Sequence, residues 1–180
     1  MKATGIVRRI DDLGRVVIPK EIRRTMRIRE GDPLEIFTNN DGGVVFKKYS
    51  LMGGLGDFSA QLCESLHKTT GRMVTITDRD TCLSVAGGGR RELTDKNVSP
   101  SLSQIMEGRK IYQRESGGRA IPICEEGDRY FTDLAAPILA EGDLLGLVLF
   151  IGTESSLPTG ETEYKLAQTI AAFLGRHMES

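Results

Sequence analysis

The first fifty residues alternate short extended runs with tight turns, and no element among them is long enough to close a hydrophobic core within one chain. Residues 3–10 and 15–18 predict two strands joined by a tight turn, because the Asp and Gly residues at 11–14 favour chain reversal. Residues 20–27 predict a short helix, and residues 34–47 predict a second hairpin around an Asn- and Gly-rich turn. A unit of this size buries too little surface alone. We therefore expect two copies of it to share one core.

The predicted helix over residues 20–27 has one apolar side and one basic side. Pro19 suits its first position, because the N–H that proline lacks would have no intrahelical partner there. At about 100° per residue, Ile22 and Met26 share the side that we expect to face the core. The opposite side carries Lys20, Arg23, Arg24 and Arg27. That side is predicted to face solvent or phosphate.

The charge of the chain is divided unevenly between its two parts. Residues 1–50 hold eleven of the 24 lysines and arginines but only seven of the 25 acidic residues, a net charge of +4 against −5 for the rest. Such an asymmetry is expected when only one end of a protein meets a polyanion. A solvated surface is the alternative interpretation, because runs of charge are usually that. Against it stands the clustering of arginines at the first turn and on the helix.

Three runs in this basic part carry a family resemblance: residues 4–9 (TGIVRR), 13–19 (LGRVVIP) and 21–24 (EIRR). They closely resemble the AbrB-type swapped-hairpin DNA-binding domain of bacterial transition-state regulators. The resemblance covers residues 1–50 and implies an intertwined dimer whose hairpins form one barrel-like core on double-stranded DNA. It implies DNA contacts by Arg8, Arg15, Arg23 and Arg24, with Arg9 and Lys20 ranked lower in the same motif. Antitoxins of addiction modules share this fold type, but a long globular C-terminal part argues against that alternative.

Residues 57–180 predict one antiparallel sheet flanked by helices, after a glycine-rich linker at 51–56. Strands are predicted over residues 73–77, 82–86, 120–124, 130–138 and 144–151, and helices over 55–66, 101–107 and 161–179. Short acidic turns between the later strands suit antiparallel neighbours. This order resembles a GAF domain, so the fold class is predicted to be α+β. The resemblance implies a small-molecule pocket near residues 97–119 with an effector of unknown identity, or a domain that only assembles the protein.

The two-part arrangement is similar to that of sporulation regulators that both activate and repress promoters. The last helix bears on the oligomeric state. Its apolar side chains spread over about half its circumference, wider than the roughly 100° stripe that docks one helix on one sheet: Tyr164, Leu166, Ala167, Ile170, Ala171, Phe173, Leu174 and Met178. With the swapped N-terminal part, two self-association surfaces predict a homotetramer.

Signatures of catalysis are weak throughout the sequence. Residues 54–59 approach a dinucleotide-binding fingerprint, but Ser59 replaces its third glycine, so linker glycines are the preferred interpretation. Cys63 and His67 lie one helical turn apart without further metal ligands in the sequence nearby. Residues 87–91 (GGGRR) lack the ending of a P-loop, and His177 has no evident partner acid or nucleophile. We expect no enzyme activity, no catalytic residue, no metal and no cofactor beyond the unknown effector.

The cellular location follows from two further features. The N-terminus lacks the apolar core of a signal peptide, and the longest hydrophobic run is far shorter than the roughly 20 residues of a membrane helix. Three cysteines, Cys63, Cys82 and Cys124, are an odd number at wide spacing and do not form a complete disulfide framework. We expect a cytoplasmic, nucleoid-associated protein without membrane contact.

Overall fold

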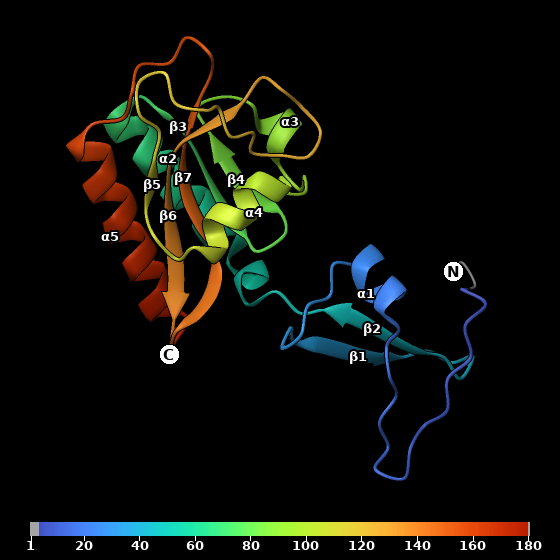
Figure 1. Ribbon diagram of the computed structural model, residues 1–180. Coiled ribbons are helices and arrows are strands. Elements are labelled where there is room, and N and C mark those ends of the chain that lie inside the picture. Colours follow the sequence, from blue (N-terminus) through green and yellow to red (C-terminus); the bar gives the residue numbers. More distant parts are fainter. Residues whose placement is uncertain (1–3, 180) are drawn as a thin grey trace. The chain divides into compact units, whose positions relative to one another are not determined.

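The computed structural model describes residues 4–179 and divides the chain into two compact units, Met1–Tyr49 and Ser50–Ser180 (Figure 1). Both units combine helices with antiparallel strands, so the α+β prediction is confirmed. We call them the N-terminal unit and the C-terminal unit. Within the described residues, no helix has the length and apolar character needed to cross a lipid bilayer.

The N-terminal unit contains α1 (Lys20–Thr25) and an antiparallel hairpin of β1 (Leu34–Thr38) and β2 (Val44–Lys48). The helix is shorter than predicted because Arg27 adopts a left-handed φ of 52°. The N–H of Ile28 then donates to the carbonyl of Arg23 at 2.8 Å, and this bond closes the helix end. Pro19 is buried and lies at the N-cap, one position before the predicted one.

In the described residues 4–19, the single chain forms neither of the two strands predicted over residues 3–10 and 15–18. Residue 3 lies outside the described residues. The turn between the two predicted strands is present, because the N–H of Gly14 donates to the carbonyl of Asp11 at 3.0 Å. The arms on either side are extended, and their apolar side chains lie in solvent: Val7 is 90% exposed and Val17 70%. An isolated hairpin with nothing packed on its apolar face is only marginally stable. The ladder that the sequence predicts therefore lacks a partner surface within the single chain.

The C-terminal unit is a five-stranded antiparallel sheet with helices on both faces, in the strand order β4-β3-β7-β6-β5. Its strands are β3 (Met73–Asp78), β4 (Cys82–Ala86), β5 (Tyr112–Gln113), β6 (Phe131–Ala140) and β7 (Asp143–Gly152). Its helices are η1 (Leu51–Leu55), α2 (Gly56–Thr70), α3 (Arg90–Leu93), α4 (Pro100–Glu107) and α5 (Glu161–His177). The central strand β7 is buried along almost its whole length, as expected for a strand covered on both faces.

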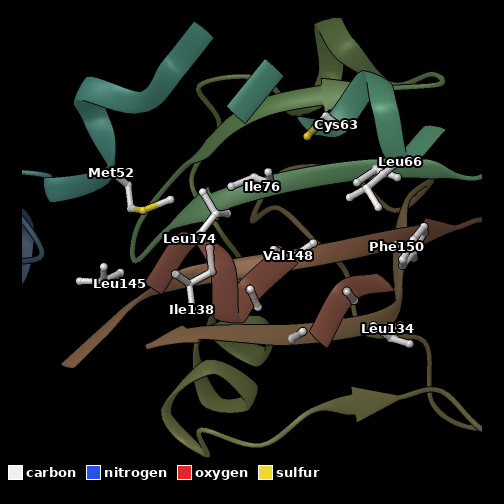
Figure 2. Close-up of a cluster of buried hydrophobic side chains, with 14 of the residues drawn as sticks. Met52, Cys63, Leu66, Ile76, Leu134, Ile138, Leu145, Val148, Phe150 and Leu174 are labelled. Atoms are coloured by element: carbon white, nitrogen blue, oxygen red, sulfur yellow. The ribbon is translucent and has the colours of Figure 1, made fainter. Parts of the chain in front are cut away.

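Two hydrophobic cores lie on opposite faces of this sheet. In the first, Val148 and Phe150 of β7 pack with Leu66 of α2 and Leu174 of α5 (Figure 2). The helix α5 runs alongside β6 in this layer (Figure 1). In the second core, side chains of α3 and α4 pack with the opposite side of β7.

The segment predicted as a linker, residues 51–56, is part of the C-terminal unit. Residues 51–55 form the 3-10 helix η1, and Met52 is 1% exposed within the first core (Figure 2). The Ser50 hydroxyl donates to the Asp78 carboxylate at 2.8 Å. The glycines of this segment predicted a linker. A single methionine produces no hydrophobic periodicity, so the burial of Met52 could not be predicted.

The strand predicted over residues 120–124 is also absent. Only isolated bridges form there, between Val98 and Cys124 and between Pro122 and Phe131. Pro122 cannot donate a hydrogen bond to a ladder, which explains why a regular strand does not continue through it. The short elements α3 and β5 were not predicted, because each is too brief to show a periodicity.

Candidate nucleic-acid interface

All six predicted DNA-contacting side chains lie in the N-terminal unit. Arg8 and Arg9 lie on the first extended arm, and Arg15 lies on the second, just past the turn. Lys20, Arg23 and Arg24 lie on α1. Arg23 is half-buried and the other five are exposed. These side chains are therefore divided between two places, the arms and the helix.

The turn between the arms fixes Arg15 through Asp11. One carboxylate oxygen of Asp11 accepts the N–H of Arg15 at 2.7 Å and that of Leu13 at 3.1 Å, and the other lies 2.7 Å from Arg15 Nε. The backbone N–H of Arg15, followed by its side chain, lowers the pKa of Asp11. The pair is exposed, and such pairs contribute little to stability because water screens them. Asp11 thus orients Arg15 in a pair that stays exposed to water.

The other five predicted DNA-contacting side chains differ from Arg15 in having no acidic partner among the described residues. Within residues 4–179, no carboxylate forms an ion pair with Arg8, Arg9, Lys20, Arg23 or Arg24. Like charges that gather without counter-charges raise the local positive potential. The N-terminal unit therefore presents the electrostatic surface that a polyanion requires.

Lys48 differs from these six bases, because it is held inside the unit. Its ammonium lies 3.3 Å from Asp32, whose side chain is 3% exposed, and donates to the carbonyl of Arg27 at 2.9 Å. This contact joins the end of β2 to the segment after α1. Sequence reasoning counted Lys48 only as charge, since its partners lie 16 and 21 residues away.

The side chains considered for catalysis or metal binding are engaged elsewhere. The Cys63 thiol lies 3.2 Å from the Ser84 hydroxyl, and burial raises its pKa to about 11, which disfavours the thiolate. His67 Nδ1 lies 2.7 Å from the carbonyl of Arg72. The His177 ring stacks on Phe173 at a centroid distance of 6.1 Å. Among the described residues, no group of three or more His, Cys, Asp or Glu side chains is arranged to hold a metal ion.

Comparison with known proteins places the whole chain. The family model described as "Stage V sporulation protein T C-terminal, transcription factor" matches residues 54–179. Stage V sporulation protein T of Bacillus subtilis (strain 168) is 46% identical over 180 residues, covering 99% of both chains. The chain belongs to the stage V sporulation protein T family. As a member of this family it is a transcription factor, and the predicted sporulation regulator is confirmed.

The two parts of this stage V sporulation protein T family member have separate relatives. The transition state regulatory protein AbrB of Bacillus subtilis (strain 168) is 59% identical over 49 residues, 27% of this chain and 50% of AbrB. Residues 7–51 also match the family model "Antidote-toxin recognition MazE, bacterial antitoxin". The AbrB resemblance is thus confirmed. The MazE match stops at residue 51, whereas the sporulation relative spans the chain.

The C-terminal unit has the fold of a GAF domain. The GAF domain/HD domain protein from Geobacter sulfurreducens aligns with a TM-score of 0.52 at 17% identity, covering 73% of this chain and 99% of that one. At this identity the likeness concerns the fold alone. The GAF-like prediction, made from the order of strands and turns, is confirmed.

Proposed function

We propose that this chain regulates sporulation genes by binding double-stranded DNA through the arginines of its N-terminal unit, as both an activator and a repressor. The observation that carries the proposal is a set of six bases, five of them exposed and five without an acidic partner among residues 4–179, in a segment 59% identical to AbrB. Arg8, Arg15, Arg23 and Arg24 make the principal contacts, and Arg9 and Lys20 assist. We assign no enzyme activity to the chain and place it in the cytoplasm, on the nucleoid.

We further propose that residues 1–50 form the DNA-binding domain as an intertwined homodimer. Supporting this, the arms expose Val7, Ile10, Leu13 and Val17, each at least 70% accessible in the single chain. Each such side chain contributes about 1.5–3 kcal/mol when it is buried. Swapped arms from two chains would complete one ladder and cover these side chains. A two-fold pair of units then doubles every arginine, which suits a duplex with two similar half-sites.

The proposed contacts divide into two kinds. Arginines on phosphates fix the position of the protein, whereas sequence is read where a guanidinium reaches base edges in the major groove or where the DNA deforms. Arg15, oriented by Asp11, and the two arginines of α1 stand on structured backbone. Arg8 and Arg9 stand on an arm whose ladder needs the partner chain. Dimer formation and DNA binding are therefore coupled in this proposal.

Salt dependence tests the proposed electrostatic binding. Each phosphate that the protein neutralises releases about 0.9 of a counterion, so log affinity should fall steeply and linearly with log salt concentration. We expect a slope of about −4 or steeper for the full chain on duplex DNA, measured by fluorescence anisotropy from low to moderate salt. The same titration on the full chain with Arg8→Ala and Arg15→Ala should give a shallower line. A slope near zero would contradict the proposal.

We propose that the C-terminal unit assembles dimers into a homotetramer. Phe173 of α5 is 47% exposed and lies 6.0 Å, between ring centroids, from Phe58 of α2. Leu62 and Ile170 on the same two helices are only partly buried. These helices together offer an apolar face that a second copy can cover. Effector sensing is the second candidate role, supported by the GAF-like fold.

Replacing Phe173 with aspartate should convert the tetramer to a dimer, because a desolvated carboxylate opposes burial of that face. Sedimentation of the purified full chain measures the mass. Leu157→Asp is the matched control, since Leu157 is 77% exposed on the loop between β7 and α5. We expect the control to keep the mass of the unaltered chain. Identical masses for both variants and the unaltered chain would refute assembly through this face.

A further inference from the structure

Two of the three cysteines face one another in the second core of the C-terminal unit. Their Sγ atoms lie 3.9 Å apart, although the residues are 42 positions apart in sequence. Cys82 is 0% and Cys124 4% exposed. Cys63 lies instead against Ser84, on the other side of the sheet. The chain therefore holds one close pair of thiols and one separate thiol.

The same backbone segment holds both members of the pair. The N–H of Cys82 donates to the carbonyl of Lys96 at 3.0 Å, and Cys124 forms an isolated bridge with Val98. These backbone contacts place the two sulfurs side by side, and adjacent thiols are what a disulfide needs.

The two thiols differ in their surroundings. Cys124 directly precedes an exposed turn at residues 125–129, where Gly127 has a φ of 122°, whereas Cys82 begins the regular strand β4. The contact with Cys82 lowers the pKa of Cys124, opposed by burial and helped by the charge of Lys96. The hydrogen bond with Cys124 and burial raise the pKa of Cys82. The thiolate is the reactive form, and Cys124 is the member of the pair that borders the exposed turn, so it is the better placed of the two for the first oxidation.

We propose that Cys82 and Cys124 are a redox pair that forms a reversible intramolecular disulfide with hydrogen peroxide. The Cys124 thiolate attacks one peroxide oxygen, and the second oxygen leaves as hydroxide and takes up the thiol proton to become water. The Cys82 sulfur then attacks the sulfenic sulfur of Cys124 and displaces hydroxide, which takes the Cys82 proton as the second water. Two thiols are oxidised by two electrons, and one peroxide is reduced to two waters.

This bond would join β4 to the segment that precedes β6. The sulfurs must close from 3.9 Å to about 2.05 Å. The segment around Cys124 lies outside any continuous ladder and is held by separate backbone bonds, such as the N–H of Ser99 to the carbonyl of Ile123 and the N–H of Glu125 to the carbonyl of Asn97. We therefore expect this segment, and not β4, to adjust. The segment that contains α3 and α4 covers the second core, and oxidation would therefore tie it more tightly to the sheet.

Peptide mapping of the full chain tests the pair. After treatment with one equivalent of hydrogen peroxide, we expect one reactive thiol per denatured chain in place of three. Digestion without reductant should yield a peptide pair linking Cys82 to Cys124, and dithiothreitol should restore all three thiols. Three thiols surviving the treatment, a linkage between different chains, or oxidation of Cys63 first would overturn the proposal.

Variants separate the roles of the two sulfurs. Cys63→Ser is the matched control and should form the disulfide as the unaltered chain does. Cys82→Ala should accumulate a sulfenic acid at Cys124 that a 1,3-dione reagent traps, and Cys124→Ala should leave Cys82 reduced. Equal trapping at both positions would refute the assigned order. If a variant fails to fold, the peptide map of the unaltered chain still decides whether the bond forms.

Discussion

Replacing both Arg23 and Arg24 with alanine is expected to lower the affinity of the full chain for duplex DNA by about 30-fold or more. Each arginine that contacts a base edge or phosphate contributes roughly 1–3 kcal/mol, so the pair contributes roughly 2–6 kcal/mol per bound subunit. Both side chains extend from α1, and neither has an acidic partner among the described residues. Alanine is the strongest helix former, so the helix should persist. Fluorescence anisotropy at fixed salt measures the loss.

The matched control removes the same charge from the other unit. Arg90 and Arg91 are consecutive, exposed arginines on the short helix α3. Their double alanine variant should bind DNA within about twofold of the unaltered chain, because α3 supplies none of the proposed DNA contacts and salt screens the charge of exposed side chains. Sedimentation and circular dichroism should show that both variants keep their assembly and fold. Equal losses in the two variants would mean that net charge alone, and not α1, governs binding.

Replacing Arg114 with methionine is expected to lower the free energy of unfolding by about 3 kcal/mol at neutral pH. Arg114 lies 2.7 Å from Asp133, whose side chain is 1% exposed, and Arg72 lies farther away at 3.9 Å. Gly152 leaves the space for this carboxylate, because a Cβ there would overlap it. Removing one partner of a buried pair strands the other charge at a cost of about 3–5 kcal/mol, and Arg72, which remains near Asp133, places the expected loss at the lower end. Urea denaturation measures the change.

The pH dependence of this loss has a definite sign. Burial raises the pKa of Asp133 in the folded chain, while Arg114, followed by Arg72, opposes that rise. Without Arg114 the folded-state pKa rises further above the unfolded value. The destabilisation is then complete above the raised pKa and disappears below the unfolded value, where Asp133 is protonated in both states. The variant should therefore approach the stability of the unaltered chain as the pH falls.

Two further variants isolate the buried pair. Arg129→Met breaks a pair with Glu92 at 3.9 Å whose side chains are 73% and 53% exposed, so it should cost less than about 1 kcal/mol. Adding Asp133→Asn to Arg114→Met should recover most of the lost stability, because the stranded charge is gone. A double variant as unstable as the single one would show that Arg114 acts by packing and not by its charge.

Much of this protein could be predicted from the sequence because the signals were local. Turn residues, strand alternation and helical periodicity predicted β3, β4, β6, β7 and the three long helices, since each depends on neighbours a few residues away. The uneven charge and the arginine-rich runs at residues 4–24 predicted the surface that the N-terminal unit presents. Predictions failed at residues 4–10 and 15–18, where the single chain offers the ladder no partner surface, and at residues 120–124, where Pro122 interrupts the strand.

Only the tertiary structure decided which residues far apart in the chain come into contact. The sequence by itself determined the family, the order of most elements and the basic character of the first fifty residues. It did not reveal that Met52 anchors η1 in the first core, that Arg114 compensates Asp133, or that Cys82 meets Cys124. These contacts arise only when the sheet brings separate segments together. A pairing across 19 or 42 residues leaves no periodic trace in the sequence, because its energy depends on a geometry that the fold creates.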